Sequence, residues 1–115
     1  MKTFLILEDE PLIAMDLKFA FEDAGCEAVT AVDNGEARSL IENSAIAGAI
    51  LDVSLGGGET CRETADRLLE RTIPFILHTG DLNRVGEHLR EIDARIIAKP
   101  RPADDVVAAL MELVG

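Results

Sequence analysis

Aromatic residues and positive charge are both scarce in this sequence. It has no Trp, no Tyr and only 4 Phe, so Leu, Ile, Val and Ala must fill most of the interior. Its 11 Lys and Arg residues are outnumbered by 22 Asp and Glu residues, which leaves a net charge of −11. A chain this acidic is not expected to bind nucleic acid or an anionic membrane through its general surface field.

Cysteine is also rare, and long hydrophobic runs are absent. The only two cysteines, Cys26 and Cys61, have no metal-ligand spacing, so we interpret them as free thiols in a reducing compartment. No apolar run approaches the length that crosses a membrane, and the first residues do not resemble a signal peptide. These observations predict a cytoplasmic protein with no membrane partner.

Linkers, low-complexity segments and repeats are missing as well, so the 115 residues predict one domain, 1–115. Short apolar runs alternate with segments of helical periodicity. The expected strands are 3–7, 27–32, 48–53, 74–79 and 94–98, and the expected helices are 12–24, 36–42, a segment around 64–69, 82–92 and 104–114. This alternation predicts an α/β fold in which βαβ units build a parallel sheet.

Two segments allow further local predictions. Pro11 suits the first turn of the first helix, and Gly25 is expected to end it. The apolar residues that recur at helical spacing between them are Leu12, Ile13, Met15, Phe19 and Ala20. The glycines at 56–58 predict a flexible loop after the third strand.

One aspartate comes directly after an apolar run. Residues 48–53 read GAILDV, a pattern typical of a strand buried on both faces. Asp52 lies at the carboxyl end of this strand, where open parallel sheets carry their chemistry. The alternative is that Asp52 only caps the following loop. The rest of the chain decides between the two interpretations.

Polar side chains occupy the equivalent position after four of the expected strands. These residues are Glu8 and Asp9, then Asp52, then Thr79, and finally Lys99. Because the carboxyl ends of parallel strands meet at one edge, we expect these side chains to share one crevice. Each alone has a simpler interpretation, as a charge near a helix terminus, a turn residue or a surface lysine. Their joint placement favours a site.

Crowded carboxylates repel one another, and a hard cation such as Mg²⁺ relieves that repulsion. The expected metal ligands are Glu8, Asp9 and Asp52. A carboxylate nucleophile, here Asp52, can attack a phosphoryl group and form an aspartyl phosphate. Such a transfer needs alignment and charge neutralisation, which the metal, Lys99 and the Thr79 hydroxyl would supply. The neighbouring His78 is given no catalytic role.

With these residues in place, the whole chain resembles a response-regulator receiver domain, the phosphoacceptor module of two-component signalling. The residues that carry the resemblance are the acidic pair after the first strand, Asp52, Thr79 and Lys99-Pro100. The resemblance implies a flavodoxin-like doubly wound sheet of strand order 2-1-3-4-5, Mg²⁺, and a phosphoryl group taken from a phosphohistidine. Residues 77–81 (LHTGD) also partly resemble the Phe-Ala-Thr-Gly-aromatic motif of a stand-alone bacterial subgroup.

Two positions depart from the receiver pattern. Gly56 stands where many receivers have Pro, and Ile96 stands where the family usually has the Tyr or Phe that changes rotamer on phosphorylation. Ile96 is β-branched and stiff at its first torsion, so it cannot sweep through space as a ring does. We therefore expect any conformational switch to pass through residues 81–91.

The sequence thus predicts a single-domain response regulator without an output domain, which signals by phosphorylation-dependent protein binding. Its expected partners are a histidine kinase or phosphotransfer protein and an unidentified downstream protein. It is expected to be a signalling phosphoacceptor rather than an enzyme. Two alternatives remain: a receiver-like module that binds partners without phosphorylation, and a small phosphohydrolase with an Asp nucleophile. Against the hydrolase, Ser54 offers no second acid near Asp52.

Overall fold

The computed structural model describes residues 1–82, 85, 89, 92 and 94–115. Most of the helix expected at 82–92 lies outside these residues, and so does most of the segment 81–91, through which we expect a switch to pass. Among the described residues, no helix combines the length and the apolar character needed to cross a membrane.

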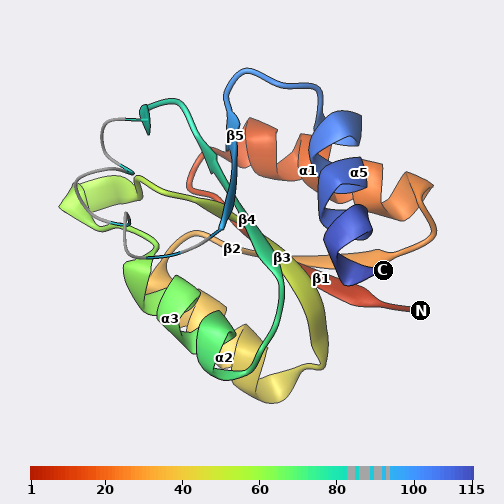
Figure 1. Cartoon of the computed structure of the whole chain (residues 1–115), viewed down its shortest axis with the longest axis horizontal. Coiled ribbons are helices and arrows are strands. Elements are labelled where there is room, and N and C mark those ends of the chain that lie inside the picture. The colour runs from red at the N-terminus through yellow and green to blue at the C-terminus, as the bar shows by residue number, and fades with distance from the viewer. Residues whose placement is uncertain (83–84, 86–88, 90–91, 93) are drawn as a thin grey trace.

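Five parallel strands form one sheet in the order β2-β1-β3-β4-β5, which confirms the predicted fold class and strand order (Figure 1). Their bounds are β1 Thr3–Leu7, β2 Glu27–Ala31, β3 Ile46–Asp52, β4 Phe75–Thr79 and β5 Arg95–Ala98. In the register of the central strands, Leu7 of β1 lies beside Leu51, and Asp52 lies beside His78 of β4. The carboxyl ends of these strands therefore share one edge of the sheet.

Helices cover both faces of the sheet. Their bounds are α1 Pro11–Asp23, α2 Asn34–Asn43, α3 Arg62–Glu70 and α5 Ala103–Val114. Helices α1 and α5 pack on one face, and α2 and α3 on the other (Figure 1). Pro11 occupies the first turn of α1 as predicted, and the Asp33 side chain caps α2 by accepting a hydrogen bond from the Glu36 N–H at 2.8 Å.

The sheet separates two apolar cores. Along β3, Ala49 and Leu51 face the core under α2 and α3, whereas Ile50 faces the core under α1 and α5. Glycine at position 48 allows close packing under α5, since a Cβ there would lie 3.1 Å from Val114 Cγ2 and 3.2 Å from the Phe4 ring, and these side chains would have to shift slightly to admit it. The sheet is thereby held between two helical layers.

Two local expectations differ from the structure. The first helix forms and buries Ala20, one of the residues at helical spacing, but Leu12, Met15 and Phe19 are exposed, and the other buried residues of α1 are Ala14, Leu17 and Phe21. The glycines at 56–58 form a short 3₁₀ turn rather than an unstructured loop, with Gly57 and Gly58 at φ of 72° and 79°. Only glycine adopts these dihedral angles readily, so the tripeptide is suited to a tight turn.

Candidate functional site

The carboxyl edge of the sheet positions an acidic cluster. Glu8 directly follows β1, and its N–H donates to the Ala31 carbonyl of β2 at 3.0 Å, which fixes the backbone at this point. Asp52 is the last residue of β3, the central strand. Ligand oxygens of Glu8, Asp9 and Asp52 all lie within 4.8 Å of one another. The structure thus brings together the three predicted metal ligands.

Lys99 enters this cluster from the end of β5. Its Nζ lies 3.1 and 3.2 Å from the two carboxylate oxygens of Glu8 and 3.5 Å from Oδ1 of Asp52. Glu8 and Asp52 are only 2% and 5% exposed, so these charges interact in a poorly hydrated environment. One ammonium against three carboxylates leaves the cluster with an excess of negative charge when all are ionised.

The pKa values reflect this imbalance. Burial, and then the neighbouring Glu8 carboxylate, raises the pKa of Asp52 from 3.8 to about 8. Burial also raises the pKa of Glu8, although Lys99 opposes the shift. Burial alone would lower the pKa of Lys99, but the carboxylates of Asp52 and Glu8 outweigh it and raise the pKa. Without a further cation, the Glu8–Asp52 pair therefore favours retaining a proton.

This donor set suits a hard divalent cation. Mg²⁺ prefers carboxylate oxygens, keeps several waters and is bound by few protein groups. A cation at Glu8, Asp9 and Asp52 would replace the retained proton and neutralise the excess charge. The geometry and the raised pKa values therefore fit the predicted magnesium site.

Thr79 is the fourth predicted contributor, and it is 1% exposed at the end of β4. Its hydroxyl oxygen accepts a hydrogen bond from the Asp81 N–H at 3.0 Å and lies 3.4 Å from the Asp81 carbonyl oxygen. The hydroxyl is thus engaged in a local turn with Asp81. Ile96, at the position of the family's aromatic switch residue, is 44% exposed on β5.

Sequence reasoning missed the role of Asn34, the first residue of α2. Its buried side-chain amide donates to the Glu59 carboxylate and, at 2.8 Å, to the Thr60 carbonyl. Its side-chain oxygen accepts a hydrogen bond from the Thr64 hydroxyl at 2.6 Å. These bonds fasten the start of α2 to the segment that leads from Asp52 into α3. A run of Asp-Asn-Gly indicates a turn and carries no signal of such a distant contact.

We expect Asn34→Ala to lower the free energy of unfolding by about 1–3 kcal/mol, because the buried Thr64 hydroxyl loses its partner and the bonds to Glu59 and Thr60 are lost. Asn43→Ala, at the exposed end of the same helix, is the matched control and should change it by less than about 0.5 kcal/mol. Urea unfolding measures both values. Equal small effects would show that the Asn34 bonds do not hold this segment.

Sequence reasoning gave His78 no catalytic role and did not predict the environment of its ring. His78 lies between Asp52 of β3 and Ile97 of β5 in the sheet register and is 3% exposed. Neither ring nitrogen has a hydrogen-bond partner among the described residues. Burial, and then the charge of Lys99, lowers the pKa of His78 to about 4. The imidazole is therefore neutral at neutral pH.

Comparison with known proteins agrees with this fold. No family model matches the sequence. The phyllosphere-induced regulator PhyR of Methylorubrum extorquens is 34% identical over 111 residues, covering 94% of this chain. This chain spans only 42% of the length of that curated relative.

Two solved structures superpose over nearly the whole chain. The solution structure of SdrG from Sphingomonas melonis Fr1 is 36% identical, covers 99% of this chain and 96% of its own, and has a TM-score of 0.82. The crystal structure of a CheY-like response regulator receiver domain protein from Methanospirillum hungatei is 26% identical, covers 99% and 94%, and has a TM-score of 0.84. The chain belongs to the response-regulator receiver family.

Proposed function

We propose that this receiver domain accepts a phosphoryl group on Asp52 from a histidine kinase or phosphotransfer protein and then binds another protein with altered affinity. One observation carries the proposal. Asp52 ends the central strand inside a cluster of carboxylates, with the ammonium of Lys99 3.5 Å from its oxygen. An aspartate that only caps a loop would need neither the neighbouring carboxylates nor the neighbouring ammonium.

In the proposed reaction, an Asp52 carboxylate oxygen attacks phosphorus, and the bond from phosphorus to the donor's leaving group breaks. The leaving group retains the electron pair of that bond, and the phosphoryl group becomes a mixed anhydride on Asp52. Mg²⁺ held by Glu8, Asp9 and Asp52 would neutralise charge on the phosphoryl oxygens. Asp52 must be deprotonated to attack, and the cation favours that form.

Two further residues stabilise the product in this proposal. Lys99 already bridges Glu8 and Asp52, so its ammonium needs little movement to contact a phosphoryl oxygen on Asp52. The Thr79 hydroxyl donates to another phosphoryl oxygen and must leave its turn with Asp81 to do so. Phosphorylation would then change the backbone interactions after β4, where Gly80 imposes little steric restriction.

Treatment with acetyl phosphate and Mg²⁺, followed by intact-mass measurement and a phosphate-release assay, tests this function. We expect one phosphoryl group per chain, removed slowly and absent when a chelator is present. Rapid multiple turnover would instead support a phosphohydrolase. An unmodified mass at saturating donor would support a module that works without phosphorylation.

A further inference from the structure

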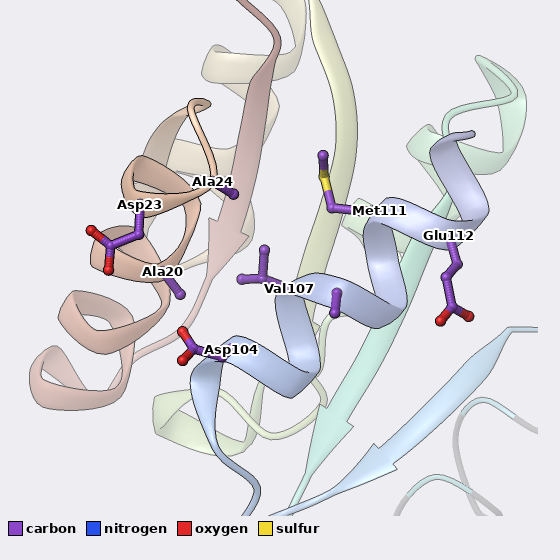
Figure 2. A pocket seen from close by; sticks show the side chains of 8 residues that line it. Ala20, Asp23, Ala24, Asp104, Val107, Met111 and Glu112 are labelled. Carbon is purple, nitrogen blue, oxygen red and sulfur yellow. The ribbon is translucent and has the colours of Figure 1, made fainter.

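A groove of about 750 Å³ lies between α1 and α5. Figure 2 shows Ala20 of α1 and Ala24, the residue after that helix, facing Val107 and Met111 of α5 across it. Ala108 completes the lining between the helices, so three alanines leave space that larger side chains could fill. None of the lining residues belongs to the acidic cluster at the carboxyl edge.

Carboxylate residues lie at the outer edges, or rim, of this α1–α5 groove, and in Figure 2 the Asp23 carboxylate points away from α5 while that of Glu112 points away from α1. Asp23 comes from α1, and Asp104 and Glu112 come from α5 (Figure 2). Glu112 pairs with Arg95 at 3.4 Å, but within the described part of the chain no basic side chain forms an ion pair with Asp23 or Asp104. The rim therefore keeps two carboxylates available to a partner.

The carboxyl end of α1 adds to this negative field, whereas the amino end of α5, beside Asp104, opposes it. Asp23 is the last residue of α1, where the helix dipole already presents partial negative charge. Neither α1 nor α5 has a basic residue in its last turn to offset that charge. A cation supplied from outside would be stabilised at this position.

Exposed apolar side chains on α1 continue the surface beyond the rim. Leu12, Met15 and Phe19 are 75%, 46% and 53% exposed, and their spacing places them along one side of the helix. Phe19 precedes Asp23 by one helical turn, so this apolar row reaches the edge of the groove. A contiguous apolar surface bordered by charge is typical of a protein-binding site.

We infer that the α1–α5 groove binds a basic amphipathic helix of another protein. Large apolar side chains of that helix would fill the space above the alanines, and its Lys or Arg residues would reach Asp23 and Asp104. A helix is favoured over an extended segment because the groove runs between two helices, and a third helix can pack its ridges there. The docking does not use Asp52.

The charges argue against a second copy of the chain, an anionic lipid surface or a nucleic acid as the occupant of this groove. Symmetric pairing with a second copy would bring Asp23, Asp104 and Glu112 against the same residues of that copy. With a net charge of −11, the chain also repels anionic lipid and nucleic acid. A cationic protein segment satisfies both the apolar floor and the acidic rim.

The test uses the unphosphorylated protein and a synthetic amphipathic helix with leucines on one side and lysines on the other. We expect saturable shifts of amide signals from Ala20, Ala24, Ala108 and Met111 in NMR spectra. A peptide with glutamates in place of the lysines should not bind. Asp52 plays no part in this binding. A failure to bind the peptide would therefore not contradict the proposed phosphorylation, and a failure of phosphorylation would not contradict the proposed groove.

Two variants of the groove and one control variant on α3 test where the peptide binds. Asp23→Lys with Asp104→Lys should weaken peptide binding at least about tenfold, because two attractions become repulsions. Asp66→Lys with Glu70→Lys on α3 changes the net charge equally and should weaken it far less. Ala108→Trp fills the groove without changing charge and should also reduce affinity. Thermal unfolding confirms that each variant is folded.

Several results would overturn the inference. Equal weakening by the α3 pair would show that the peptide responds only to overall charge. Shifts that map outside the groove, or undiminished binding to folded Ala108→Trp, would place the contact elsewhere. Binding to phosphatidylglycerol vesicles, or a dimer that Asp23→Lys with Asp104→Lys abolishes, would assign the surface to a membrane or to a second copy.

Discussion

We expect Asp52→Asn to gain no phosphoryl group from acetyl phosphate under conditions that modify the wild-type chain. An amide oxygen is a far weaker nucleophile than a carboxylate, and the substitution also removes a metal ligand. Asp66→Asn, on the exposed side of α3, is the matched control and keeps the wild-type extent of modification. Intact mass reports both. If Asp52→Asn is modified to the same extent as wild type, Asp52 is not the acceptor.

We expect Asp52→Asn to remain folded, so that loss of the reaction would not come from unfolding. The pKa of Asp52 is raised to about 8, which means that the folded chain disfavours its charged form. A neutral amide of nearly the same shape removes the repulsion from Glu8. We therefore expect the metal-free Asp52→Asn protein to unfold at the same temperature as wild type or higher at about pH 8. A much lower midpoint would contradict the account of the cluster as repulsive.

Saturating Mg²⁺ should raise the thermal midpoint at about pH 8 by roughly 10 °C, because it binds the folded cluster and relieves its repulsion. Cation at about a hundred times its Kd stabilises the fold by about 2.7 kcal/mol, and 1 kcal/mol corresponds to several degrees in a domain of this size. Calorimetry with MgCl₂ and with EDTA measures the difference. In Asp9→Asn, which lacks one of the metal ligands, Mg²⁺ should raise the thermal midpoint much less.

The same cluster sets the sign of the pH dependence. Asp52 has a pKa of about 8 in the folded chain and 3.8 in the unfolded one, so between these values the folded state holds more protons. The metal-free protein should therefore lose stability as the pH rises from about 4 to about 8. Protons compete with the cation, so the gain from Mg²⁺ should be small near pH 5 and large near pH 8. A stabilisation by Mg²⁺ that does not vary with pH would contradict binding of the cation at this cluster.

The acidic edge could be predicted because it depends on short-range patterns, whereas the strand order 2-1-3-4-5 was implied by the resemblance to receiver domains. The strands β3 and β4 end in a polar residue, and a polar residue directly follows β1 and β5, so the parallel connections bring these polar residues to one edge. The positions of Asp52 and Lys99 along the chain therefore determined where they would lie in space. No knowledge of side-chain packing was needed for that step.

The buried side of α1 could not be predicted in the same way. Helical periodicity identifies a helix, but this helix carries apolar residues on several sides, and only contact with the sheet selects Leu17 and Phe21 over Leu12 and Phe19. The Asn34 network was hidden for a different reason. Its bonds join residues up to 30 positions apart, and no local pattern encodes them.

The ion pair between Glu8 and Lys99 joins residues 91 positions apart. During synthesis from the N-terminus, the three carboxylates leave the ribosome well before Lys99 does. A nascent chain can therefore expose its acidic residues, but it cannot supply the ammonium that lies against them in the folded molecule. The proposed transfer to Asp52 would consequently begin only after the last strand has emerged and joined the sheet, so incomplete chains would not compete with finished ones for the phosphodonor.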